Sequence, residues 1–452
     1  MSRPSFVRSL GLTDATMLVV GCIVGAGIFR SAGAIAGHVA SPSATLVLWL
    51  LGGLLSLGGA LCYAELAAMF PATGGDYIFI TQTYGRFWGF LFGWTKVFVE
   101  RTGTIAILGK VFGEYASVVL GLRQEWTVQV LAAAAILLLT SVNILGVRWG
   151  KYAQNVFTAL KIFALVSVVC AGVAAAFHAP PAHPSWSLPP LSASLVQSAG
   201  VALVFVLWTY GGWTEAAYVA EEVQDPSRNI PRAIIGGVLL TAVLYLLVNW
   251  TYLLWVPLTE LAQSKTVAAT IMQRCAGQAG ALFMAIMIGC SAFGAVNGYI
   301  LTGGRILYAL GKDHPLFAWL GAVHPRFHTP AGALWINALV AIGLVCTKTF
   351  DQIATYSTLA ITVFFTMAVF AVIILRRTRP ELPRPYRTWG YPFTPWCYGL
   401  LMIGFMVNIC VMAPRDAVFG FGFLAIGLPL YWCSQSLCRP IEQPSAAEES
   451  IA

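Results

Sequence analysis

Glycines are concentrated in an apolar run near the start of the sequence, residues 13–36, which is long enough to cross a membrane. In the middle of this run Gly25 and Gly27 flank a single alanine. Two glycines in one turn destabilise the helical conformation there. An opened turn exposes N–H and C=O groups that hydrocarbon cannot satisfy, so a solute with charged ends could bind there. Close helix packing is the alternative, because Gly21 and Gly25 have the spacing that lets helices touch.

A second apolar run, residues 194–222, is interrupted in the same way by aromatic residues and glycines at positions 208–213 (WTYGGW). Two glycine-broken spans in corresponding places of two halves of a chain indicate a solute site near the middle of the membrane. The pair of interruptions therefore favours a binding site over packing alone.

Lys161 lies about two turns inside another apolar run, residues 153–177, with no acidic residue nearby in sequence. A buried ammonium needs oxygen partners, and the opened backbone of the first run is a natural source of carbonyls. Sodium sites in broken-helix transporters are built from such carbonyls, so a fixed lysine there would make sodium unnecessary. The alternative is a lysine that extends to the membrane surface.

Charged side chains also occur inside residues 88–120 and in the second interrupted run. Lys96, Glu100, Arg101 and Lys110 lie in residues 88–120, where Lys96 and Glu100 are four apart and can pair on one helix face. Glu215 follows the second interruption. Intramembrane charges face the protein interior, so Glu215 either binds a cation or proton in a cavity or pairs with a basic residue of residues 88–120.

Three further acidic residues lie near the ends of apolar runs. Glu65 is predicted to tether a loop rather than to carry a proton. Glu221 and Glu222 begin a charged loop in which ion pairs to Arg228 or Arg232 could form a latch, although a solvated loop is equally consistent with this pattern.

The composition indicates an integral membrane protein, because 58% of the 452 residues are hydrophobic and only 10% are charged. We expect an all-α fold in one transmembrane domain, residues 1–437, followed by a short cytoplasmic tail, residues 438–452. Twelve spans are predicted, at residues 12–37, 43–70, 88–120, 126–145, 153–177, 194–222, 232–256, 281–310, 331–347, 351–375, 396–413 and 416–437.

Basic residues are concentrated in alternate connecting segments, including residues 376–387, which places both termini on the cytoplasmic side. The net charge of +8 is therefore attributed to orientation and anionic lipid rather than to nucleic acid. The histidines at positions 314, 324 and 328 have no metal-ligand spacing. No phosphate-binding loop or cluster of catalytic side chains is present, so we expect neither an enzyme nor a bound cofactor.

Several stretches resemble the amino acid–polyamine–organocation superfamily, and within it the L-type amino acid transporters and their bacterial relatives. The resemblance covers residues 8 to about 435 and rests on the stretches at 25–29, 65–77, 210–213, 221–233, 297–305 and 385–387. It implies two inverted repeats of five spans (residues 12–177 and 194–375), with discontinuous first and sixth helices, and two additional helices within residues 396–437.

The resemblance also implies roles for individual residues. Backbone N–H groups of Gly25, Ala26 and Gly27 would hold a substrate carboxylate at a helix N-terminus. Lys161 would stand at the position that sodium occupies in sodium-dependent members, and with Glu215 it is a candidate coupling residue.

The substrate α-ammonium would bind carbonyl oxygens of Ile23, Trp208, Thr209 and Gly211, and Trp208 would close over the substrate. Ala26 replaces a serine that is common in L-type relatives, and Trp208 replaces a phenylalanine. The segment near residues 120–126 has no cysteine, so no disulfide-linked heavy subunit is expected.

These features together predict a plasma-membrane secondary transporter that exchanges small neutral L-amino acids without sodium by alternating access. The alternative is a proton-coupled or exchange porter for cationic amino acids, amines or polyamines, which Glu215 would favour.

Overall fold

The structure is a computed structural model that describes residues 8–25, 27–39, 41–122, 124–177, 186–190, 192–264, 267–346, 350–412 and 414–436. Over these residues the chain is helical, and its only β interaction is an isolated parallel bridge between Leu10 and Val223. The elements are α1 (Leu12–Ile23), α2 (Gly27–Val39), α3 (Pro42–Met69), α4 (Asp76–Tyr84), α5 (Arg86–Thr95), η1 (Lys96–Arg101), α6 (Thr102–Leu120), α7 (Glu125–Ile144), α8 (Val147–Ala176), α9 (Ala193–Thr209), α10 (Glu215–Tyr218), η2 (Ala220–Glu222), α11 (Pro226–Trp255), α12 (Leu258–Gln263), α13 (Val267–Asp313), η3 (Pro315–Gly321), α14 (Ala331–Cys346), α15 (Phe350–Thr378), α16 (Phe393–Met412) and α17 (Pro414–Ser436).

Eight helices of the described chain are long and apolar enough to cross a membrane. The other predicted spans correspond to shorter apolar helices at Leu12–Ile23, Ser194–Thr209, Ala331–Cys346 and Phe393–Asn408. The chain is therefore a multi-pass, all-helical membrane protein, and the predicted tail at residues 438–452 lies outside the described residues.

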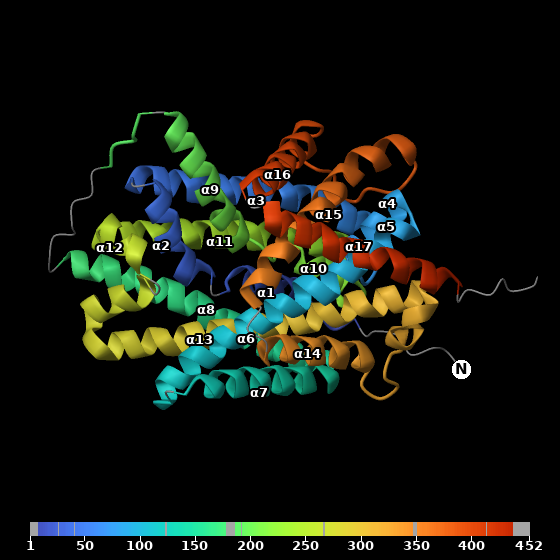
Figure 1. Cartoon of the computed structure of the whole chain (residues 1–452), viewed down its shortest axis with the longest axis horizontal. Helices are drawn as coiled ribbons and strands as arrows, with labels where there is room; N and C mark the ends of the chain where they lie inside the picture. The colour runs from blue at the N-terminus through green and yellow to red at the C-terminus, as the bar shows by residue number, and fades with distance from the viewer. Residues whose placement is uncertain are drawn as a thin grey trace, which may run out of the picture.

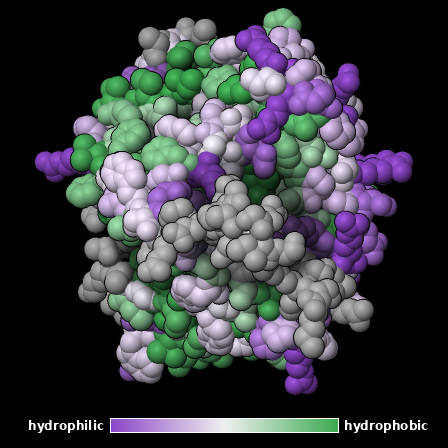
Figure 2. All heavy atoms as spheres, turned by 90° about the vertical axis from the view of Figure 1, so that its right-hand side faces the viewer, coloured by the Kyte–Doolittle hydropathy of each residue, from purple (hydrophilic) through white to green (hydrophobic). Residues whose placement is uncertain are grey.

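Most long helices run along the long axis of the molecule (Figure 1). The short helices α4 and α12 lie at opposite ends of this axis, which we call the α4 end and the α12 end. Figure 2 looks onto the α4 end, where hydrophilic side chains surround a hollow near the centre of the face. The longest helix, α13, bends at Ala276 and Gly277, where Gly277 has a φ of 62°.

Three of the apolar segments are not regular α-helices. The first is divided between α1 and α2, and the sixth between α9 and α10, as the glycine patterns predicted. In the third, a six-residue π-helix, η1, separates α5 from α6 and contains Lys96 and Arg101. Short π-helical segments occur often at functional sites because they change the direction in which side chains point.

Glu65 connects α3 to the end of α15 and to the loop that follows it, which confirms its predicted role as a loop tether. Its carboxylate accepts two hydrogen bonds from Arg376 at 2.8 and 2.6 Å and one from the Thr388 backbone N–H at 2.7 Å. This bidentate contact fixes the start of the loop that leads to α16.

Candidate functional site

The two interruptions meet at Gly212. Its φ of 106° lies in the left-handed region that favours glycine, and a Cβ atom at this position would lie 2.8 Å from the backbone carbon of Cys22 and 3.1 Å from the amide nitrogen of Ile23. Gly27 makes a second close approach, since its Cβ would lie 3.2 Å from the Thr209 side chain. The glycines therefore bring the two opened backbones into contact.

Tyr245 of α11 connects both interruptions and was not identified from the sequence. Its buried hydroxyl lies 2.9 Å from the carbonyl oxygen of Ile23 and 3.3 Å from that of Thr209. These are two of the carbonyls that were predicted to bind an α-ammonium group. A tyrosine within an apolar run gives no sequence signal for this role, because its partners lie far away along the chain.

The carbonyl groups around the first interruption accept hydrogen bonds from other helices. Lys161 donates to the Gly21 carbonyl at 2.5 Å, and Ser291 of α13 donates to that of Val24 at 3.2 Å. Lys161 is fully buried, so it does not extend to the membrane surface. The Gly25 N–H, predicted to bind a carboxylate, here donates to Ile23 at 2.8 Å, and Ala26 lies outside the described residues.

The second interruption is partly exposed. The Trp208 side chain is 52% exposed, whereas Thr209 is buried and donates from its hydroxyl to Ser31 at 3.0 Å. The Trp208 carbonyl accepts from the Gly211 N–H at 3.0 Å. Trp208 and Thr209 thus lie against Gly27 at the crossing, and their binding of a substrate remains a prediction.

Glu215 pairs with a basic residue of the third apolar segment, which is one of its two predicted roles. Its Oε2 atom lies 3.0 Å from Nη1 of Arg101 and accepts a hydrogen bond from the Thr302 hydroxyl at 2.5 Å, and all three side chains are buried. Lys96 and Glu100 pair as predicted, at 3.2 Å. Thr302 was not identified from the sequence.

The predicted ion pairs between the acids at 221–222 and Arg228 or Arg232 are wrong, because both acids have other partners. Glu222 instead pairs with Arg305 of α13 at 2.8 Å, and both side chains are completely buried. Glu221 accepts from the Thr73 backbone N–H at 3.2 Å. A buried carboxylate requires a partner, and α13 provides one where the exposed loop arginines do not.

A polar stripe on α8 faces α1. Lys151 lies 2.9 Å from Asp14, Asn155 donates to the same carboxylate at 2.6 Å, and Thr158 donates to the Met17 carbonyl at 3.0 Å. With Lys161, these side chains hold α1 along most of its length.

His314 follows α13 and is buried against aromatic rings, with ring centroids 4.8 Å from Phe90 and 6.1 Å from Tyr431. Burial lowers the pKa of His314 to about 4, so the ring is neutral near pH 7. No cluster of metal-ligating side chains occurs in the part of the chain that the structure describes.

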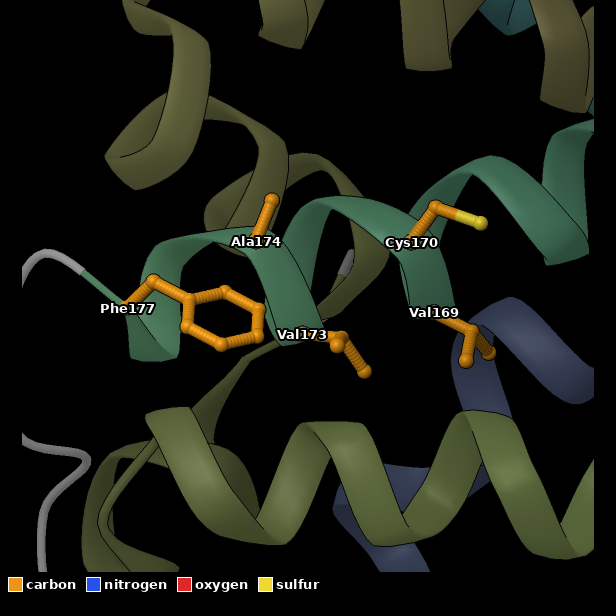
Figure 3. A pocket seen from close by; sticks show the side chains of 5 residues that line it. All are labelled: Val169, Cys170, Val173, Ala174 and Phe177. Carbon is orange, nitrogen blue, oxygen red and sulfur yellow. The ribbon is translucent and has the colours of Figure 1, made fainter.

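A hollow lies on the C-terminal part of α8 (Figure 3). It is lined by Val169, Cys170, Val173, Ala174 and Phe177, whose side chains are apolar apart from one thiol. This surface has no groups that would bind a zwitterion.

Sequence comparisons show which family this architecture represents. Residues 10–431 match the family model described as amino acid permease. The chain belongs to the amino acid permease family. This permease is therefore a membrane transporter, as the resemblance to the amino acid–polyamine–organocation superfamily predicted.

Three relatives illustrate the range of the family. The permease is 33% identical to mouse (Mus musculus) b(0,+)-type amino acid transporter 1 over 86% of this chain and 80% of the relative. It is 30% identical to the serine/threonine exchanger SteT of Bacillus subtilis (strain 168), with 86% and 88% covered. It is also 30% identical to human (Homo sapiens) large neutral amino acids transporter small subunit 2, with 94% and 80% covered.

Proposed function

We propose that this permease is a sodium-independent exchanger of small neutral L-amino acids that works by alternating access. The observation that carries the proposal is the crossing of two interrupted helices with Lys161 bonded to the Gly21 carbonyl. The similarity to a serine/threonine exchanger supports small neutral substrates and exchange.

The substrate carboxylate would bind at the N-terminus of α2, at the N–H groups of Gly25, Ala26 and Gly27. Its ammonium would bind carbonyls of Ile23, Trp208, Thr209 and Gly211. Several of these groups are already paired with each other or with Tyr245. Substrate binding therefore exchanges internal hydrogen bonds for new ones, which avoids leaving unpaired polar groups in the membrane when the site is empty.

Lys161 supports independence from sodium. Its amino group donates a hydrogen bond from α8 to the Gly21 carbonyl near the end of α1, where broken-helix transporters use carbonyls to bind a cation. A second positive charge at the same carbonyl would be repelled.

For the architecture, we propose twelve spans in one domain, residues 1–437, with inverted repeats at residues 12–177 and 194–375 and additional helices at 396–437. The α4 end would face the cytoplasm, together with both termini, because Arg86, Lys151 and Lys312 lie in segments at this end. The permease would act in the plasma membrane without a heavy subunit, a cofactor, nucleic acid or catalytic chemistry.

A porter for cationic amino acids, amines or polyamines is the alternative that Glu215 favoured. The Glu215 carboxylate is compensated by Arg101, so it offers no free charge to a cationic substrate. This pairing weakens the alternative.

Counterflow into reconstituted proteoliposomes tests both functions. We expect labelled serine, threonine or alanine to accumulate against an unlabelled internal pool, equally with sodium or choline as the external cation. Leucine, arginine and putrescine serve as the substrate panel. Accumulation of arginine or putrescine in place of the small neutral amino acids, or a requirement for sodium, would contradict the proposal.

A further inference from the structure

Five ionisable side chains form a cluster between the second interruption and α4, four of them buried and one, Glu100, 19% exposed. The acids are Asp76, Glu100 and Glu215, and the cations are Lys96 and Arg101. Fully ionised, the cluster carries one negative charge in excess. An uncompensated buried charge is strongly unfavourable, so the cluster needs a proton or a cation.

The ion pairs show which acid is left over. Lys96 lies 3.2 Å from Glu100, and Arg101 lies 3.0 Å from Glu215. Asp76 has no ion pair within 4 Å among the described residues. Its Oδ2 atom accepts a hydrogen bond from Tyr63 of α3 at 3.1 Å, and its buried Oδ1 atom has no hydrogen-bond partner there.

Asp76 lies at the start of α4, outside the membrane-spanning helices, and its surroundings favour the protonated acid. Burial, with a smaller contribution from the Glu215 carboxylate, raises the pKa of Asp76 to about 6 against the opposing effects of Lys96 and of the Tyr63 hydrogen bond. The Tyr218 hydroxyl of α10 also lowers this pKa. Elsewhere around α4, the Tyr77 hydroxyl donates a hydrogen bond to Asp313 at 2.7 Å. The positive charge of Arg86 lowers the pKa of the same tyrosine.

We propose that Asp76 is a proton-binding site, and that its proton is held while the ion pair between Arg101 and Glu215 joins α10 to η1. The proton comes from water and returns to it. The reason for the link is that the start of α4 contacts α10, where the Gly74 N–H donates to the Tyr218 carbonyl at 3.4 Å. Displacement of α10 would open the buried surroundings of Asp76 to water and move the Glu215 charge away from it, and both changes favour the ionised acid. By reciprocity, protonation of Asp76 stabilises the position of α10 in which Glu215 pairs with Arg101.

This inference rests on the proposed exchange function for its effect on transport. Exchange requires α10 to move, so a protonated Asp76 slows it. We expect the rate of serine homoexchange to rise about fivefold from pH 5 to pH 7.5, with equal pH on both sides of the proteoliposome membrane. The midpoint of this rise should lie near the pKa of Asp76, about 6.

Asp76→Asn is the decisive variant, because the amide resembles the protonated acid and keeps the contact with Tyr63. Its exchange rate should stay near the wild-type value at pH 5 over the whole range. Asp313→Asn is the matched control, since it neutralises another acid beside α4, and it should keep the wild-type profile. A pH profile that is flat in the wild type, or unchanged in Asp76→Asn, would overturn the proposal.

A stability measurement tests the proton site without any substrate. A carboxyl group whose pKa is higher in the folded state than in the unfolded state loses its contribution to stability as pH rises through the folded pKa. The melting temperature in detergent should therefore fall between pH 4 and pH 7 in the protein that contains Asp76, and not in Asp76→Asn.

The stability series is best carried out in a His314→Phe background, because His314 has the opposite pH dependence. If no amino acid is exchanged but the stability profile depends on Asp76, the proposed function fails and the proton site stands. If serine is exchanged and Asp76→Asn changes neither profile, the proton site fails and the exchanger stands.

Discussion

The two interrupted helices are stabilised by different kinds of interaction. Around the first interruption, neutral backbone carbonyls accept hydrogen bonds from Lys161, Tyr245 and Ser291. Beyond the second interruption, acidic side chains are held by cations, with Glu215 paired to Arg101 and Glu222 paired to Arg305. One region is organised around the main chain and the other around charge.

This difference separates binding from movement. Backbone groups of the first region can exchange one hydrogen-bond partner for another at small cost, which suits a site that is alternately filled and empty. Buried ion pairs are costly to separate, so they define discrete positions of α10 and η2 against η1 and α13. The comparison predicts that substitutions in the charged region affect stability most and that those near the carbonyls affect transport most.

The largest effect is expected from Arg101→Met, which leaves the Glu215 carboxylate buried without its cation. Loss of one partner of a buried pair costs about 3–5 kcal/mol, and thermal unfolding in detergent measures it as a lower melting temperature. Combining it with Glu215→Gln removes the leftover charge and should restore most of the stability.

The exposed pair of Arg274 and Glu260, at 2.6 Å, provides the control for this series. Arg274→Met should cost less than about 1 kcal/mol, because solvent screens exposed charges. Equal losses at Arg101 and Arg274 would show that burial of the α10 pair is unimportant.

Gly212→Ala tests the point at which the two regions meet. The new methyl group would overlap the backbone of Cys22, and the backbone would be strained at a positive φ, for a loss of about 1–3 kcal/mol. Serine binding, measured by scintillation proximity, should be lost. Gly200→Ala is the control, since a Cβ there meets no atom within 4 Å, and unchanged binding in Gly212→Ala would remove the crossing from the site.

Lys161→Ala tests the carbonyl region. Loss of a hydrogen bond to a charged group, about 1.5–3 kcal/mol, corresponds to roughly 10- to 100-fold slower exchange, with membrane insertion retained. Lys312→Ala, which changes an exposed lysine in the last turn of α13, should leave exchange unchanged. Normal exchange kinetics in purified Lys161→Ala protein would show that the lysine does not organise the site.

The smallest effect is expected at His314, which belongs to neither region. Its pKa of about 4 in the folded protein lies below the ordinary value of 6.5, so its contribution to stability is complete above pH 6.5 and declines as pH falls toward 4. Between pH 7.5 and pH 6 the loss of stability amounts to about 0.8 kcal/mol. The pH dependence of unfolding in His314→Phe should lack this decline; an identical acid-side decline in that variant would assign it to another group.

Much of the helical architecture was predictable because hydropathy and glycine spacing are local properties. The boundaries of α7, α14 and α17 lie within a few residues of the predicted spans, and α1 and α9 end where the glycine patterns placed the interruptions. The pairing of Lys96 with Glu100 was also predictable, because four residues separate them on one helix face.

The partners of the other buried polar groups were decided only by tertiary structure. Tyr245, Ser291 and Thr302 look like ordinary residues of apolar helices, and Arg305 rather than a neighbouring loop arginine pairs with Glu222. The sequence determined that this chain crosses the membrane and where its helices open. Only the fold decided which distant side chains satisfy the opened backbone and the buried acids, because in a membrane each such group must find a partner among whichever helices pack beside it.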